Sequence, residues 1–133
     1  MASIFSRIVA GEIPCHKVAE SEAFLAFLDI MPLANGHTLV IPKREVDRIW
    51  DLEPAELGDL HRFSQQVALA IEATVPCQRV GQAVIGLEVP HAHIHLIPLN
   101  RVADINFERP KLQVTPEELA ATAAALRAAF DAR

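Results

Sequence analysis

Three histidines alternate with apolar residues between positions 90 and 98, where the sequence reads Pro-His-Ala-His-Ile-His-Leu-Ile-Pro. In a β-strand, residues two positions apart point to the same face of the sheet. His91, His93 and His95 would then line one face over roughly 13 Å, at about 3.3 Å per residue. The apolar residues between them would face the other way, into a core. The alternation therefore predicts a strand with one buried face, and it limits the chain to folds that contain a sheet.

Three aligned imidazoles have three chemical interpretations. A stripe that only forms hydrogen bonds is disfavoured, because burying imidazoles costs free energy that Val or Ile at these positions would avoid. A metal site is possible, but zinc prefers Cys or a carboxylate to complete its ligands, and Glu88 is the nearest carboxylate. In nucleophilic catalysis at phosphorus, one neutral imidazole attacks while another group holds its second nitrogen. The spacing alone does not choose between the metal site and the nucleophile.

The size and charge of the chain exclude several classes of protein. Its 133 residues suit one domain, 1–133, and its net charge of −5 argues against a basic surface for nucleic acid. No apolar run approaches the roughly 18 residues that a membrane span needs, and the N-terminus lacks the pattern of a signal peptide. Cys15 and Cys77 form no CxxC pair, so a reducing compartment is favoured. We therefore expect a cytoplasmic protein that binds neither nucleic acid nor membrane.

The first half of the chain contains signals for a helix, a hairpin and a strand. Residues 3–10 predict a short helix with Ser3 as its N-cap and Gly11 as its stop. Residues 19–29 predict two short strands joined by a turn. The turn signal Asn-Gly at 35–36 precedes a strand over 37–41.

The second half predicts two helices and two more strands. A single apolar face runs along residues 54–73, which indicates a long central helix. Residues 78–87 and 90–98 predict strands. Thr115 opens a capping box with proline at the first helical position, so a C-terminal helix begins there. Because helical crossovers do not alternate with the central strands, the pattern favours an antiparallel α+β fold.

The segment 91–97 resembles the signature of the histidine triad family, and most strongly its branch of nucleotide-binding proteins. Further motifs of that branch occur in the expected order, so the likeness runs from Ile4 to about Asn100. They are Ile4-Phe5, Gly11-Glu12-Ile13-Pro14, the segments 24–30 and 36–43, and Gly86 ahead of the triad. The resemblance implies a five-stranded antiparallel sheet with a central and a C-terminal helix, a core of about 3–100 and an extension of 101–133. It also implies a symmetric homodimer, with the central helix as an element of the interface.

The resemblance assigns chemistry to four histidines. It implies that His93 attacks the α-phosphorus of a nucleoside monophosphate derivative, and that water hydrolyses the resulting nucleotidyl-histidine. The backbone carbonyl of His91 would hold the other nitrogen of His93. His95 would contact the phosphate and the leaving group, and His37 would complete the cluster.

The resemblance also assigns a nucleotide-binding surface, with a purine nucleoside monophosphate or its derivative as the partner and no cofactor. Asp29 would accept hydrogen bonds from the ribose hydroxyls, although the residue alone suggests a solvated turn. Phe5, Ile8, Phe27 and Ile30 fall in segments that form the base pocket, although apolar packing is the stronger explanation for each residue taken alone. His16 and His61 match no motif, and we interpret them as surface or helix-face residues.

The sequence departs from the family pattern near the phosphate and at a zinc site that some relatives carry. Ser3, Ser6 and Glu45 stand where those relatives have zinc ligands, so we predict no metal. Glu88 replaces a Ser or Thr that helps to hold phosphate. A carboxylate facing the phosphate would repel it, so Glu88 either points away or orients a histidine.

Three classes of function follow as expectations. The first is a hydrolase, either a nucleoside phosphoramidase or nucleotidyl hydrolase or, as the alternative, a dinucleoside polyphosphate hydrolase. The second is a nucleotide-binding or interaction module with weak activity, which the change at Glu88 would permit. A metal-binding protein is a third interpretation.

Overall fold

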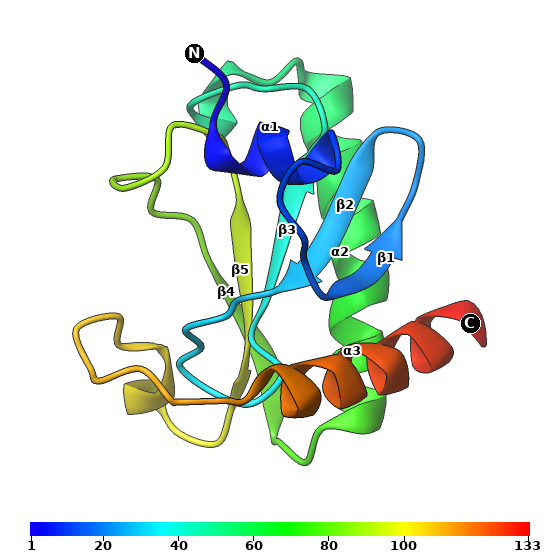
Figure 1. Cartoon of the computed structure of the whole chain (residues 1–133), viewed down its shortest axis with the longest axis vertical. Helices are drawn as coiled ribbons and strands as arrows, with labels where there is room; N and C mark the ends of the chain where they lie inside the picture. The colour runs from blue at the N-terminus through cyan, green and yellow to red at the C-terminus, as the bar shows by residue number, and fades with distance from the viewer.

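The structure, a computed structural model, describes all 133 residues. A five-stranded antiparallel sheet forms its centre, with the strand order β1-β2-β3-β5-β4 (Figure 1). The strands are β1 (Lys17–Glu20), β2 (Phe24–Leu28), β3 (Thr38–Pro42), β4 (Arg79–Ala83) and β5 (Ile94–Leu99). The predicted α+β class, hairpin and antiparallel sheet are confirmed.

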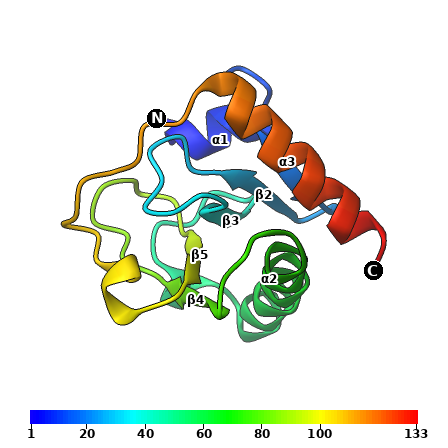
Figure 2. The same ribbon diagram turned by 90° about the horizontal axis from the view of Figure 1, so that it is seen from below.

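The helices divide between the two faces of the sheet (Figure 2). They are α1 (Ile4–Val9), α2 (Pro54–Thr74) and α3 (Pro116–Asp131), with short 3₁₀ helices η1 (Ile49–Asp51) and η2 (Val102–Ile105). The central helix α2 packs on one face, and α3 packs against α2 and along β1. The short helix α1 lies on the other face. No helix combines the length and the apolar character that crossing a membrane requires.

The helix ends follow the sequence signals. The hydroxyl of Ser3 caps α1 by accepting from the backbone N–H of Ser6, at 2.9 Å. Thr115 and Glu118 form a capping box at the start of α3. Both predicted N-caps are therefore confirmed.

Residue parity separates the two faces of the sheet. Even-numbered strand residues such as Ala26, Val40 and Ile94 belong to the large core beneath α2 and α3. Odd-numbered residues of β2 and β3 form a second, smaller core with Phe5 of α1; they are Leu25, Phe27, Leu39 and Ile41. The predicted alternation along the histidine segment is confirmed for its apolar side, since Ala92, Ile94 and Leu96 all lie in the large core.

Two predicted strands are shorter than expected. The strand predicted over 90–98 begins only at Ile94. Its register, continued past His93, would bring Ala92 opposite Pro42, which has no N–H to donate and whose carbonyl accepts from Nε2 of His91. The N–H of Ala92 instead donates to Val46 O, at 2.6 Å. The strand predicted over 78–87 ends at Ala83, which pairs with His95, one residue from the first residue of β5, Ile94. His91 and His93 therefore precede the ladder and still face the same side as His95.

Candidate active site

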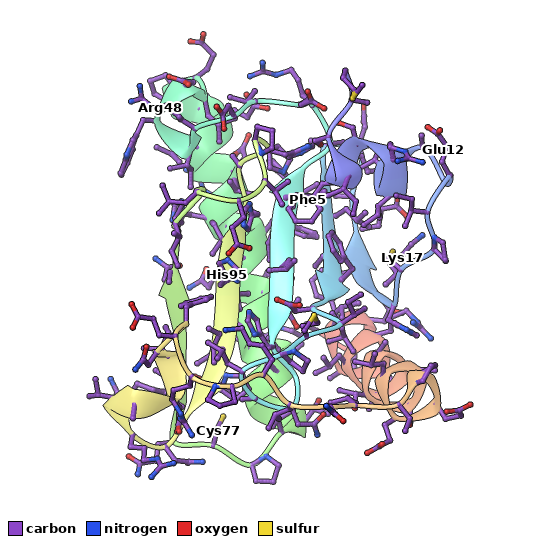
Figure 3. The ribbon with its side chains drawn as sticks, turned by 60° about the vertical axis from the view of Figure 1, so that its left-hand side comes forward. Phe5, Glu12, Lys17, Arg48, Cys77 and His95 are labelled. Atoms are coloured by element: carbon purple, nitrogen blue, oxygen red, sulfur yellow. The ribbon has the colours of Figure 1, made fainter.

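Four histidines meet on the face of the sheet opposite α2, which is turned toward the viewer in Figure 3. The rings of His93 and His95 are 4.9 Å apart between centroids, and those of His37 and His95 are 5.2 Å apart. His95 lies opposite Leu39 in the β3–β5 ladder, which places it on the same face as the smaller core. All four side chains are buried or nearly so. The structure thus brings together the four histidines expected at the site.

His93 is held through one ring nitrogen only. Its Nδ1 lies 2.7 Å from the backbone carbonyl of His91. A carbonyl only accepts, so Nδ1 carries a proton, and in the neutral ring Nε2 keeps the lone pair. The edge-on ring of Phe5, 5.0 Å away between centroids, packs against the imidazole and restricts its orientation. A neutral imidazole with an available, oriented lone pair is the form that a nucleophile requires.

His37 fixes the protonation pattern of His95. The backbone N–H of Leu33 donates to Nδ1 of His37, at 3.0 Å, so the proton of His37 is on Nε2. That Nε2–H lies 3.0 Å from Nδ1 of His95 and donates to it. The proton of neutral His95 is therefore on its own Nε2. This chain of bonds makes His95 a donor at the nitrogen that the protein leaves without a partner.

Burial keeps this pair neutral. It lowers the pKa of His37 to about 4 and, together with the neighbouring His93, lowers the pKa of His95 to about 3. Burial also lowers the pKa of His91. At neutral pH these three rings therefore carry one proton each, which the hydrogen-bond pattern requires.

The unpaired nitrogens of His93 and His95 are accessible. Neither Nε2 has a hydrogen-bond partner, and no buried side-chain nitrogen or oxygen in the structure lacks one, so both atoms reach the surface of the site. Nε2 of His93 offers a lone pair, and Nε2 of His95 offers a proton for a hydrogen bond. Such a pair can attack an electrophilic centre while donating a hydrogen bond to an oxygen or leaving group on it.

Asp29 lies at the edge of this cluster. Its carboxylate accepts from the N–H of Met31, at 2.9 Å, and approaches Nε2 of His37 to 3.7 Å. Burial raises its pKa, and the charge of exposed Glu88 adds to this effect. Ligand atoms of Asp29, His37 and His95 lie within 4.8 Å of one another, which would suit a metal ion. A metal there would replace the His37–His95 hydrogen bond, which already explains the arrangement.

The four apolar residues expected in a base pocket are not all placed alike. Phe5 and Phe27 are buried against each other with ring centroids 5.6 Å apart, and Ile8 packs on the same cluster. Ile30 is outside this cluster and 65% exposed, beside Asp29. Phe5 and Phe27 are thus core residues, and Phe5 also packs against the ring of His93.

The loop before the triad contains Gly86, which matches the family pattern, and Glu88, which departs from it. Gly86 has φ +74°, and a Cβ there would meet no atom within 4 Å. Glu88 is exposed and forms no hydrogen bond with a histidine, while Val89 packs on the smaller core. Glu88 therefore does not orient a histidine in this structure, although its charge reaches Asp29.

Ser3, Ser6 and Glu45, the positions of the zinc ligands in some relatives, also lie together. They are hydrogen-bonded to one another and to His91. Neutral hydroxyl oxygens are not among the ligands that zinc prefers, and each side-chain donor and acceptor buried here already has a partner. These residues do not fit a zinc ion.

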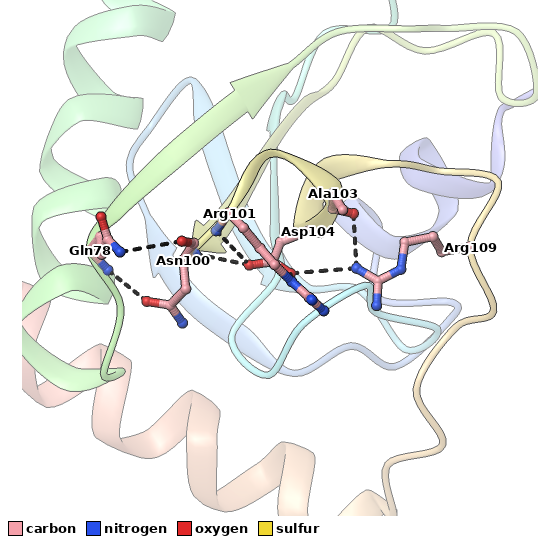
Figure 4. Close-up of polar contacts among 6 residues, drawn as sticks. All are labelled: Gln78, Asn100, Arg101, Ala103, Asp104 and Arg109. Carbon is pink, nitrogen blue, oxygen red and sulfur yellow. Dashed lines mark hydrogen bonds and ion pairs between the residues drawn. The ribbon is translucent and has the colours of Figure 1, made fainter.

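The segment after β5 contributes residues that the sequence reasoning missed. Its first turn is anchored by Asp104, which accepts from Arg101 and Arg109, while Arg109 also donates to Ala103 O (Figure 4). The edge of Phe107 then reaches His95, with ring centroids 4.7 Å apart.

Lys111 follows on the same segment and brings a positive charge to the site. Its ammonium lies 5.9 Å from the centre of the Phe107 ring and donates to the Phe107 carbonyl. The next residue, Leu112, donates from its N–H to Pro32 O at 2.8 Å, which ties the segment to the loop after Asp29. The charge of Lys111 lowers the pKa values of His37 and His95 and opposes the upward shift at Asp29. No local pattern in the sequence marks Phe107 or Lys111.

Comparisons with known proteins agree with this geometry. The family model of the HIT domain matches residues 10–102. The chain is 37% identical to the adenosine 5′-monophosphoramidase of Schizosaccharomyces pombe over 124 residues, which cover 91% of this chain and 92% of that protein. A zinc-bound histidine triad family protein from Mycobacterium smegmatis superposes with a TM-score of 0.84 at 28% identity, covering 99% of this chain and 95% of the other.

A second similar structure is a hypothetical histidine triad nucleotide-binding protein from Sulfolobus tokodaii. It has a TM-score of 0.82 at 26% identity and covers 96% of this chain and 91% of its own. The family model spans more than half of the present chain and includes all four clustered histidines. The chain therefore belongs to the HIT domain family.

Proposed function

We propose that this protein hydrolyses nucleoside monophosphate derivatives at the α-phosphorus, with His93 as the nucleophile. The observation that carries the proposal is the 2.7 Å bond from His93 Nδ1 to the carbonyl of His91. It leaves the lone pair of Nε2 available beside the donor Nε2–H of His95. The similarity to an adenosine 5′-monophosphoramidase supports a phosphoramidate as substrate.

The reaction proceeds in two displacements. Nε2 of His93 attacks phosphorus and the phosphorus–nitrogen bond breaks, so the amine leaves with the bonding electron pair and takes up a proton from solvent, which the attacking water of the second step gives back. Water then attacks the nucleotidyl-histidine, which releases the nucleoside monophosphate and regenerates neutral His93. His95 donates from Nε2 to the phosphoryl oxygens, where negative charge is concentrated in both steps.

Asp29 and the apolar cluster supply the binding surface for the nucleoside. A carboxylate accepts from both hydroxyls of a ribose, so Asp29 favours ribonucleotides. Phe5, Ile8 and Ile30 offer apolar surface to a base, and we propose a purine there. Glu88 stands close enough to this surface for its charge to affect Asp29.

Lys111 supports a second candidate reaction, the hydrolysis of dinucleoside polyphosphates. The leaving group in that reaction is a nucleotide with several negative charges. The ammonium of Lys111 is the cation whose charge reaches Asp29, His37 and His95. A cation there favours an anionic leaving group more than a neutral amine.

The test compares the intact mass of the protein during turnover of adenosine 5′-phosphoramidate with that of the variant His93→Ala. The wild type should gain one adenylyl group when the second step is slowed by cold and the reaction is stopped with denaturant at alkaline pH, where a phosphorus–nitrogen bond to histidine survives. His93→Ala should lose turnover and adduct while still binding the nucleotide. His16→Ala, at a histidine outside the cluster, serves as the control. Turnover by His93→Ala at the wild-type rate would contradict the proposal.

We also propose that the chain forms a homodimer through β4 and α2. β4 is an edge strand, so one side of its backbone is unpaired within the chain. A hollow beside it is lined by residues of both elements, including His61, Gln65 and Gln82.

Light scattering during gel filtration tests the dimer. The wild type should have twice the chain mass of 14.6 kDa. Gln82→Lys, which places like charges near the two-fold axis, should shift the mass toward the monomer. Gln113→Lys, the same change on an exposed segment away from this edge, should not. A monomeric wild type would contradict the proposed dimer.

A further inference from the structure

We propose that Ser3, Ser6 and Glu45 are positioning residues for the nucleophile, and that they act through His91. This inference rests on the proposed role of His93 and extends it to three residues that touch no substrate. Helix α1 brings the two serines to the imidazole of His91, and the exposed Glu45 reaches both serines from the chain after β3.

The hydrogen-bond roles in this cluster have one consistent assignment. Nε2 of His91 lies 2.8 Å from the carbonyl of Pro42, so this nitrogen carries the proton. Nδ1 of His91 is then an acceptor, and the Ser3 hydroxyl, at 2.7 Å, donates to it. The Ser3 oxygen in turn accepts from the N–H of Ser6.

Glu45 completes the assignment by accepting hydrogen bonds from the two remaining donors. Its Oε1 accepts from the backbone N–H of Ser3 and from the hydroxyl of Ser6, both at 2.7 Å. The Ser6 oxygen also lies 3.4 Å from Nδ1 of His91, but its single proton is already donated to Glu45. The network therefore aims the Ser3 proton, and not that of Ser6, at His91.

The network bears on catalysis because His91 holds His93 through its backbone. The fully buried ring of His91 is fixed at both nitrogens, by Ser3 on one side and Pro42 on the other. Its backbone carbonyl is the acceptor for Nδ1 of His93. Because His91 precedes the β-ladder, strand pairing does not hold this carbonyl in place. The Ala92 N–H of the same peptide group donates to Val46 O, at 2.6 Å, and the side chain of His91, fixed at both nitrogens, adds a second restraint on this carbonyl.

The decisive variant is Ser3→Gly, compared with Ser3→Thr. Glycine is almost as good an N-cap as serine, so it removes the hydroxyl without greatly weakening α1, and threonine keeps the hydroxyl. By analogy with the hydrogen-bond partners of metal-bound histidines, Ser3→Gly should lower kcat roughly 10-fold. KM for the nucleotide should change less than about twofold, since Phe5 and Asp29 remain in place. Ser3→Thr should restore most of kcat.

Nitrogen-15 NMR of the histidines provides a readout that does not depend on activity. Ser3→Gly should shift the His91 Nδ1 signal as its hydrogen bond is lost, and the Nδ1 proton of His93 should exchange faster with solvent. If His93→Ala keeps full turnover, the proposed function fails whatever these signals show. If Ser3→Gly loses the bond to Nδ1 and yet keeps wild-type kcat, the positioning role fails and the proposed function stands.

Glu45 gives a second test at an exposed position, where folding is less at risk. Glu45→Ala removes the acceptor of both serines and should lower kcat about threefold, whereas Glu45→Gln keeps an acceptor oxygen and should stay within about twofold of wild type. Glu22→Ala, at another exposed acid, is the matched control. Equal kcat values for Glu45→Ala, Glu22→Ala and wild type would overturn the role of Glu45.

Discussion

Lowering the pH from 6.5 to 5 should destabilise this protein through its active-site histidines. The pKa of His37 is about 4 and that of His95 about 3 in the folded protein, against 6.5 for an unperturbed histidine. Between pH 6.5 and 5 the unfolded chain therefore takes up protons that the folded protein does not. The contribution of these two histidines to stability is complete above pH 6.5 and is lost as the pH falls toward their folded-state pKa values.

The size of this loss at pH 5 depends little on the folded-state values. Both rings are still largely neutral in the folded protein at pH 5. The unfolded-state pKa of 6.5 lies about 1.5 units above this pH, so protonation of each histidine in the unfolded chain costs about 2 kcal/mol of stability. The pair should cost about 4 kcal/mol of unfolding free energy. His91, whose pKa is also lowered, acts in the same direction, whereas Asp29, whose pKa is raised, acts in the opposite one. Glu20 and Asp104, with pKa values of about 2, contribute mainly below pH 5.

Urea unfolding of wild type, His37→Gln, His95→Gln and the double variant at pH 7 and pH 5 measures this loss. Each single variant should lose about 2 kcal/mol less than wild type between the two pH values, and the double variant about 4 kcal/mol less. All four proteins keep His91 and Asp29, so the contributions of these two residues cancel when the losses of the variants are compared with that of wild type. Equal losses in all four proteins would refute the claim that the cluster is neutral.

Three further predictions concern the edges of the site. Lys111→Met should raise the pKa values of His37, His95 and Asp29, as seen by NMR titration, because a nearby positive charge is removed; Lys17→Met is the control. Ile30→Ala, at an exposed side chain, should raise KM for the nucleotide while changing stability by less than about 0.5 kcal/mol. Gly36→Ala should lower Tm more than Gly11→Ala: both have positive φ, but only at Gly36 would a Cβ lie 2.9 Å from Val75.

Local periodicity was enough to predict that the three triad histidines share one face, whereas the place of His37 beside them followed only from the family resemblance. The parity of the triad, of β2 and of β3 places odd-numbered residues on the side of Phe5, and the structure keeps that parity even where the ladder has ended. Strand ends were less predictable, because the start of β5 at Ile94 depends on the missing N–H of Pro42, on another strand.

The residues missed by sequence reasoning owe their place to tertiary contacts. Phe107 and Lys111 lie in an irregular segment whose path over His95 is set by the bonds of Asp104 and Leu112. The sequence shows Ser3 and Glu45 as lost zinc ligands, but not that they share hydrogen bonds next to His91. Such contacts join residues far apart in the chain, and no periodic pattern encodes them.

The stereochemical course at phosphorus distinguishes a covalent nucleotidyl-His93 intermediate from direct attack by water. A substrate made chiral at the α-phosphorus with sulfur and oxygen isotopes can be hydrolysed and its product configuration determined by phosphorus NMR. Two in-line displacements, the first by His93 and the second by water, each invert the configuration, so the account predicts overall retention. Overall inversion would mean that water attacks phosphorus directly, and would contradict a nucleotidyl-His93 intermediate.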